Sequence, residues 1–188
     1  MSLPKPPIPV KLIVSIISGN QELAGAVIER LSERFGSTDV VSDMMPFDYT
    51  DYYAAEIGTE LFRRMVSFTQ LIDPDELSEI KLFTNDMETH FARPDGTRQV
   101  NIDPGYISLW HLVLASCKPF AHRPYLGKGV YADLTLLYRG KTFTPLAWTF
   151  PDYRSQPMIA LLNDVRERYY QQVKKVLRAQ RFLRNTQH

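Results

Sequence analysis

The chain has 188 residues, of which 44% are hydrophobic and 23% are charged, and this balance excludes a disordered or fibrous protein. Its formal net charge of +1 lacks the excess of lysine and arginine that a general nucleic-acid or anionic-membrane binder requires. We therefore expect one soluble domain over residues 1–188, with an extended Pro-rich segment at 1–9 and a frayed tail at 185–188.

The first predicted elements are a buried strand and a helix. Residues 10–18 are nearly all apolar and β-branched, which is typical of a strand buried on both faces in the centre of a sheet. Ser18 and Gln21 have the spacing of a capping box, so we expect a helix to follow and to end at Gly36. The apolar stripe of this helix comprises Leu23, Val27 and Leu31.

Two more strands and a second helix follow. Residues 38–47 predict one strand, and residues 61–71 predict another. On this strand, one face carries Phe62, Val66 and Phe68. Residues 73–76 combine an N-cap acid, a proline at the first helical position and a glutamate at the third, so they predict a helix start. The apolar stripe of this helix comprises Leu77, Ile80, Thr84, Met87 and Phe91.

The second half of the chain begins with a short strand predicted at 98–103. The apolar run within residues 108–117 suits either a short buried helix or a buried strand, and we favour the helix. Residues 130–137 alternate in polarity and a glycine turn leads to 142–148, which predicts a β-hairpin. Pro145 places the second strand of this hairpin at an edge of the sheet.

A long amphipathic C-terminal helix is predicted from Met158 onward. Its apolar positions are Ile159, Leu162, Val165, Tyr169, Val173 and Val176. The order of elements predicts an α+β fold in which a ferredoxin-like β-α-β-β-α-β half is extended by an antiparallel hairpin and this helix.

The cysteine content and the hydropathy of the chain indicate the cellular compartment that it suits. Cys117 is the only cysteine, so the chain can form no internal disulfide and suits a reducing, cytoplasmic environment. No apolar run is long enough to span a bilayer, so we expect no membrane association. Because Cys117 follows an apolar run and lacks an activating neighbour, we expect an inert, buried thiol.

Several signatures of known chemistry are missing. The chain has no GxxxxGK[ST], GxGxxG, HExxH, CxxC or GxSxG motif, so dinucleotide-binding, zinc-finger and serine-hydrolase classes find no support. Asp48, Asp51 and Glu56 offer oxygen ligands, but their spacing fits no known ion-binding loop, and a solvated acidic loop is favoured. The sequence therefore assigns no cofactor and no metal, and it leaves open whether the protein is an enzyme.

Acidic, basic and aromatic residues gather near the ends of predicted strands and at the base of the hairpin. The candidate ligand-binding residues are Asp103, Tyr106, His122, Arg123, Tyr125, Lys128 and Asp133. We expect His122, Arg123, Lys128 and Asp133 to converge with Asp103 on one concave site, because an arginine and a lysine so close in sequence would be stabilised by a bound anion. This mixture suits an anionic small molecule that is phosphorylated or nucleotide-like.

Each of these residues also has a structural interpretation. His122 and Arg123 suit an ion pair with Asp103 or Asp133, which is the slightly favoured reading, and Asp103 before Pro-Gly suits a turn cap. A hydrophobic core or cross-strand pairs would suit the aromatic residues, namely Tyr49, Tyr52, Tyr53, Tyr125, Tyr131 and Trp148. Under this interpretation the chain is a non-catalytic module that binds a protein or RNA.

A basic helical face near the C-terminus bears on the same alternative. It is formed by Lys174, Arg178 and Arg181. These residues could contact RNA or a protein partner, but we favour a solvated helix end whose charges complement the helix dipole. The oligomeric state is left open.

Six motifs spread along the chain carry a resemblance to a known family. They are FDYTDYY at Phe47, LIDPDEL at Leu71, IKLFTND at Ile80, NIDPGYI at Asn101, HRPYLGKGVYADLTL at His122 and WTFPDYR at Trp148. Through them the chain resembles the DUF4416 family of uncharacterised bacterial proteins over nearly its whole length. The resemblance implies no activity, substrate or catalytic residue. Some members carry a GTP-binding label, but this sequence lacks both a phosphate loop and an NKxD motif, so we expect no specific GTPase activity.

Overall fold

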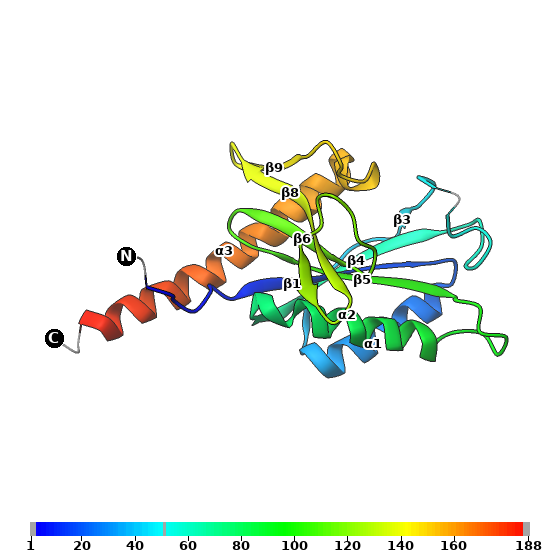
Figure 1. Ribbon diagram of the computed structural model, residues 1–188, viewed down its shortest axis with the longest axis horizontal. Coiled ribbons are helices and arrows are strands. Elements are labelled where there is room, and N and C mark those ends of the chain that lie inside the picture. The colour runs from blue at the N-terminus through cyan, green and yellow to red at the C-terminus, as the bar shows by residue number, and fades with distance from the viewer. Residues whose placement is uncertain (1–2, 51, 186–188) are drawn as a thin grey trace.

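An antiparallel sheet organises the computed structural model, which describes residues 3–50 and 52–185 (Figure 1). Across the described residues it has nine strands in the order β2-β4-β1-β5-β6-β8-β7, with β3 paired to β4 and β9 paired to β8. The strands are β1 (Val10–Ser18), β2 (Thr38–Val41), β3 (Met45–Pro46), β4 (Phe62–Ile72), β5 (Val100–Ile107), β6 (His111–Ser116), β7 (Tyr125–Gly127), β8 (Val130–Arg139) and β9 (Thr142–Pro145). Residues 186–188 of the predicted tail lie outside the described chain.

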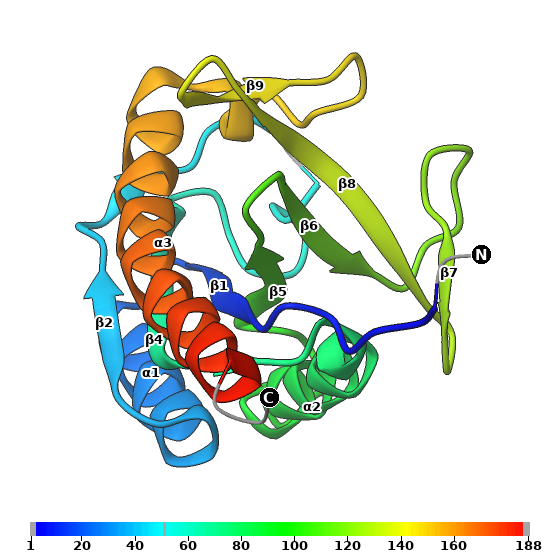
Figure 2. The same ribbon diagram turned by 90° about the vertical axis from the view of Figure 1, so that its left-hand side faces the viewer.

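Three α-helices of the described chain cover the two faces of this sheet (Figures 1 and 2). They are α1 (Gln21–Phe35), α2 (Leu77–His90) and α3 (Gln156–Asn185). Helices α1 and α2 lie on one face and α3 crosses the other. Short 3-10 turns at Pro74–Glu76 and Asp152–Arg154 precede α2 and α3.

Strand β1 is central, as its sequence predicts. All nine of its residues are buried, and it pairs with β4 on one side and β5 on the other. Because side chains alternate along a strand, Leu12 and Val14 pack with α1 and α2, whereas Ile13 packs with α3. The single strand β1 therefore supplies the core on both faces.

The predicted α+β class is confirmed, with its C-terminal helix and an antiparallel hairpin of β8 and β9. Pro145 lies at the end of the edge strand β9. The narrower ferredoxin-like topology is not confirmed, because the strand order of the full sheet differs. Strand β7 had no counterpart in the sequence prediction.

Three local predictions are corrected by the structure. Asn20, and not Ser18, caps α1, because its Oδ1 accepts the Leu23 N–H at 3.1 Å while Ser18 is still in β1. The strand expected at 38–47 is broken between β2 and β3, where the Ser42 Oγ accepts the backbone N–H of Met65 at 2.9 Å.

The third correction concerns residues 108–117, where we favoured a helix and the structure has strand β6. This strand pairs with β5 on one side and β8 on the other, and residues 112–115 are buried. A four-residue apolar run is compatible with either a helix or a strand, so pairing with β5 and β8 determines that a strand forms.

Within residues 3–50 and 52–185, every helix is too short or too polar to cross a membrane.

Candidate functional site

The sheet opens between β5 and β6. Within the described chain these strands pair only from Gly105 to Ile107, opposite Leu112 to Leu114, and residues 100–104 of β5 have no partner on β6. Pro104, which has no N–H to offer a neighbouring strand, stands where the pairing stops. At Gly105 the strands approach so closely that an added Cβ would lie 2.5 Å from the Val113 carbonyl oxygen. We call this point the fork of the sheet.

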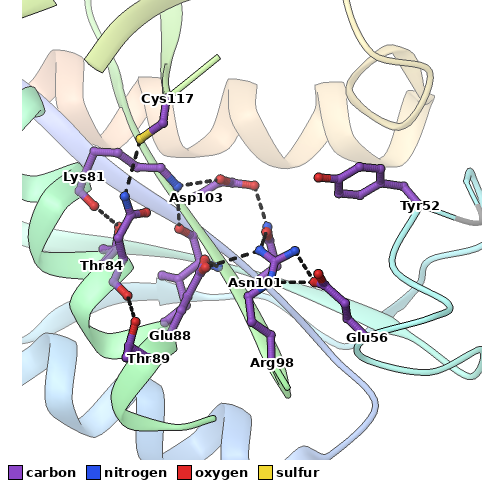
Figure 3. A network of polar contacts seen from close by, with 12 residues as sticks. Tyr52, Glu56, Lys81, Thr84, Glu88, Thr89, Arg98, Asn101, Asp103 and Cys117 are labelled. Atoms are coloured by element: carbon purple, nitrogen blue, oxygen red, sulfur yellow. Dashed lines mark hydrogen bonds and ion pairs between the residues drawn. The ribbon is translucent and has the colours of Figure 1, made fainter. Parts of the chain in front are cut away.

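Side chains of α2 fill the place of the missing strand beside β5 (Figure 3). The Glu88 carboxylate accepts the Ile102 N–H at 2.6 Å, and the Lys81 Nζ donates to the Ile102 carbonyl oxygen at 3.2 Å. Lys81 also donates to Asp103 Oδ1 at 2.9 Å. Two charged side chains thus satisfy backbone groups that a neighbouring strand would otherwise pair, and the fork stays open.

The charged side chains beside β5 shift one another's pKa values. Burial raises the pKa of Glu88, although the Ile102 N–H and Lys81 oppose the change. Burial acts to lower the pKa of Lys81, but Asp103 and Glu88 outweigh it and raise the pKa overall. The recessed position of Asp103 acts to raise its pKa, yet Lys81 holds the pKa below its usual value. Asp103 and Lys81 are therefore a stable ion pair at neutral pH.

A cavity of about 760 Å³ lies at the fork, on the α3 side of the sheet. Its aromatic lining consists of Phe47, Tyr49, Tyr52, Tyr53, Phe150 and Tyr153. Its cationic lining consists of Arg63, Lys81, Arg98, Lys118 and Arg123. Its carboxylates are Glu88, Asp103, Asp133 and Asp152. These residues come from the loop after β3, from β4, β5 and β8, from α2 and the segment between α2 and β5, and from the segments after β6 and β9.

The floor of the cavity holds a buried ion pair between Arg63 of β4 and Asp152, whose side chains are only 7% and 8% exposed. The guanidinium carbon of Arg63 lies 4.7 Å from the ring centre of Phe47 and 5.0 Å from that of Tyr153. Burial raises the pKa of Tyr153, so its phenol keeps its proton at neutral pH. The floor therefore combines a fixed cation with a neutral hydroxyl donor.

The rim of the cavity is held by a second set of contacts. Arg123 Nε donates to Asp133 Oδ2 at 2.7 Å, and Arg123 Nη1 donates to the Lys118 carbonyl oxygen at 3.1 Å. The Lys118 Nζ donates to the Tyr52 hydroxyl oxygen at 2.7 Å, and this hydrogen bond lowers the pKa of Tyr52. Arg98 pairs with Glu56 of the covering loop and with Glu88. These contacts tie the loop after β3 to the sheet.

Four of the seven sequence-predicted residues meet at or beside this cavity. Asp103, Arg123 and Asp133 line it. His122 lies outside the lining, stacked on Trp148 at 4.9 Å, with its Nε2 3.6 Å from Asp133 Oδ2. The expected ion pair with Asp133 is therefore found for Arg123, and His122 lies beside the same carboxylate, while Asp103 pairs with Lys81 and does not cap a turn.

The other three predicted residues lie elsewhere, and the expected convergence is wrong for Lys128. Tyr106 lies on the opposite face of the sheet, because it alternates with Asp103 along β5. Tyr125 lies exposed on edge strand β7, where its hydroxyl accepts the Gly129 N–H at 3.1 Å. Lys128 points to α2 and pairs with Glu79, because the turn between β7 and β8 faces that helix.

Sequence reasoning missed the residues that make the floor and the fork: Arg63, Lys81, Glu88, Arg98 and Asp152. One signal was present, since Lys81 and Glu88 are seven positions apart and border the apolar stripe of α2. Asp152 lies in a WTFPDYR segment that mixes acidic, basic and aromatic residues. The position of Arg63 depends on a distant pairing with Asp152, which leaves no local signal.

The expectation of a buried thiol is also wrong. Cys117 is exposed, lines the cavity, and lies 3.4 Å from the Asn85 Nδ2. It is the first residue after β6 and follows the end of that strand that has no pairing with β5. For metals, residues 3–50 and 52–185 contain no group of three or more His, Cys, Asp or Glu side chains that could hold an ion.

The fold and the cavity define an α+β protein in which a large antiparallel sheet opens around a polar and aromatic cavity. The chain belongs to the family described as a domain of unknown function, DUF4416, whose model matches residues 8–169. The family resemblance seen in the sequence is thereby confirmed. No curated protein and no solved structure matches the chain.

Proposed function

We propose that the cavity at the fork binds a small anionic molecule that also carries a flat or apolar group, such as a phosphorylated or nucleotide-like metabolite. The volume of about 760 Å³ supports this proposal, because ligand pockets span roughly 300–1,000 Å³. Six aromatic side chains among the described residues can stack on a flat group.

The observation that carries the proposal is the burial of charge at the cavity floor and fork. Arg63, Asp152 and Lys81 are each at most 8% exposed in their side chains. Removing an ion from water costs several kcal/mol, and apolar residues of the same size would stabilise a fold at least as well. A concentration of such groups on one cavity is therefore typical of a binding or catalytic site.

The balance of charge favours an anion. Among the described residues, five cations and four carboxylates line the cavity. Lys118 differs from the other four cations because its Nζ donates to the Tyr52 phenol and has no described carboxylate within 4 Å. An anionic group at the rim would therefore gain an attraction that is not already used by an ion pair.

The test is a thermal-shift titration with the four nucleoside 5′-monophosphates on wild type and two matched variants. Lys118→Gln removes a cation from the rim, and Lys128→Gln removes an exposed cation outside the cavity. At about 100 Kd a ligand adds about 2.7 kcal/mol to stability, which raises Tm by roughly 5–10 °C for a domain of this size.

We expect wild type and Lys128→Gln to show the same shift and Lys118→Gln to show a smaller one. Equal shifts in all three proteins would place the ligand elsewhere. A panel that leaves the wild-type Tm unchanged, extended to phosphosugars, would contradict the proposed function.

One observation favours the alternative of a protein- or RNA-binding module. Phe120, Trp148 and Phe150 are exposed aromatic side chains that surround His122 and Arg123 beside the cavity. Rings of this kind can stack on single-stranded RNA. The small-molecule proposal is preferred because one of these rings, that of Phe150, lines the cavity. A mobility shift with single-stranded RNA that is lost in Phe120→Ala, together with no response to metabolites, would reverse the preference.

A further inference from the structure

The guanidinium of Arg63 uses little of its hydrogen-bonding capacity. A guanidinium carries five N–H donors in one plane. Arg63 Nη1 donates to Asp152, whereas the buried Nε has no acceptor among the described residues. No described residue accepts from Nη2 either. A buried arginine of this kind differs from a structural one, whose donors are normally satisfied.

The position of Arg63 restricts where an acceptor can lie. The rings of Phe47 and Tyr153 cover the guanidinium at 4.7 and 5.0 Å, and Asp152 occupies the Nη1 side. The edge formed by Nε and Nη2 is what remains, and Arg63 lines the cavity. Two parallel N–H groups on one edge match the two oxygens of a carboxylate or phosphate.

Two further donors without partners lie at the same place. The hydroxyls of Ser15 and Tyr153 are both buried, and Ser15 is near enough to the Tyr153 phenol to oppose the rise in its pKa, but neither hydroxyl forms a well-aligned hydrogen bond among the described residues. Tyr153 contacts the Arg63 guanidinium with its ring, and Ser15 is paired across the sheet with Met65, two residues from Arg63. Buried polar groups are rarely left unpaired, so three of them together indicate a missing acceptor.

We propose that Arg63 is the anchor for an oxyanion of the ligand, a carboxylate or a phosphate, which it receives on its Nε and Nη2 edge with the Tyr153 hydroxyl as an additional donor. This inference rests on the proposed function, because it names the subsite of the same cavity. Asp152 and the two rings hold the guanidinium in place, so little side-chain freedom is lost when the oxyanion binds.

The test uses two simple probes, inorganic phosphate and malonate, at constant ionic strength with sodium chloride as the reference. Binding to wild type is measured by thermal shift and through the NMR resonance of the Arg63 Nε–H. We expect the Nε–H signal to move downfield with at least one probe. Phosphate alone, malonate alone or both then define the class of oxyanion, and each of these results supports the anchor.

Two variants separate the anchor from a structural role. Arg63→Lys keeps the charge but loses the planar fork, and we expect affinity for the active probe to fall by about tenfold or more. If Arg63→Lys does not fold, the double variant Arg63→Met with Asp152→Asn removes the buried pair as a unit and should bind neither probe. Lys128→Gln, outside the cavity, should bind as wild type does.

Three outcomes overturn the inference. Unchanged affinity in Arg63→Lys or in the double variant removes Arg63 from the site. Nucleotide binding by wild type without any response to phosphate or malonate, and with equal nucleotide affinity in the variants, leaves the proposed function standing and removes the anchor. No response of wild type to any probe or nucleotide contradicts both.

Discussion

Two buried cations on the same face of the sheet, one at each end of β1, differ in how fully they are paired. Lys11 is fully buried under α3, and its Nζ donates to Asp39 Oδ2 at 2.6 Å and to the Phe68 carbonyl oxygen at 2.7 Å. Arg63, at the fork end, donates to Asp152 and leaves an N–H buried without an acceptor. The first cation is satisfied by the fold, and the second is not.

This difference distinguishes an ion pair that stabilises the fold from one that can take part in ligand binding. Asp39 is also held by the Ser67 hydroxyl at 2.5 Å, so the Lys11 pair joins three neighbouring strands through side chains, and neither Lys11 nor Asp39 lines the cavity at the fork. The Arg63 pair borders the cavity. A buried charge therefore points to a ligand only when its hydrogen bonds are incomplete and space lies beside it.

The largest expected effect is on the satisfied pair. Lys11→Met leaves Asp39 recessed without its cation, and we expect the free energy of unfolding to fall by about 3 kcal/mol. Urea denaturation measures the loss, and Lys11→Met with Asp39→Asn should recover part of it. A loss below about 1 kcal/mol in the single variant would show that the pair is not structural.

The same pair predicts a pH dependence. Burial acts to raise the pKa of Asp39, but hydrogen bonds from Lys11 and Ser67 hold it below the ordinary value of 3.8. A depressed carboxyl pKa stabilises the fold above the unfolded-state pKa, and this contribution is lost as pH falls through the folded pKa.

Wild type should therefore exceed Asp39→Asn in urea midpoint by a constant margin from about pH 7 down to about pH 4, and the margin should shrink below that. A margin that is already shrinking above about pH 5 would assign the effect to another group.

A smaller effect on stability is expected at the unsatisfied pair. Arg63→Met with Asp152→Asn removes a buried ion and its unpartnered donors together, so we expect unfolding free energy to stay within about 1 kcal/mol of wild type. Chemical denaturation and circular dichroism test this expectation. A loss of about 3 kcal/mol or more would make this pair as structural as the one at Lys11.

The smallest effect concerns Cys117, whose modification should leave stability unchanged. Because the thiol is exposed at the cavity, we expect a disulfide-exchange reagent to label native protein at a rate within about tenfold of unfolded protein. A nucleotide that raises Tm should slow this labelling. Labelling that requires unfolding would mean that the thiol is covered.

Local sequence patterns were sufficient for elements whose partners do not decide their conformation. The β-branched run of β1, the Asp-Pro-Asp-Glu start of the second helix and the alternation of β8 each predict the observed element. Residues 108–117 were assigned wrongly because a short apolar run becomes a strand only when β5 and β8 flank it.

The site was predictable only where its charged residues gather in the sequence. Asp103, Arg123 and Asp133 were found in this way and do line the cavity, although Asp103 and Asp133 lie within β5 and β8 and not at strand ends. Lys81 and Glu88 were missed because they reach the cavity through a gap in the sheet, which is a tertiary feature. Lys128 was included wrongly because it is close to Arg123 in sequence, but the turn between β7 and β8 directs its side chain to Glu79 of α2.

The fork has a consequence for motion. Only three described residue pairs join β5 to β6, with Gly105 at the point of closest approach, so the angle between the two halves of the sheet is held by few backbone hydrogen bonds. Asp103 and Arg123 lie on opposite sides of this junction. A molecule that contacts both residues would bind one fork angle more tightly than others and would narrow the range of angles that the protein samples. Amides of Tyr106 and Val113 would then exchange with solvent more slowly in the bound state than in the free state.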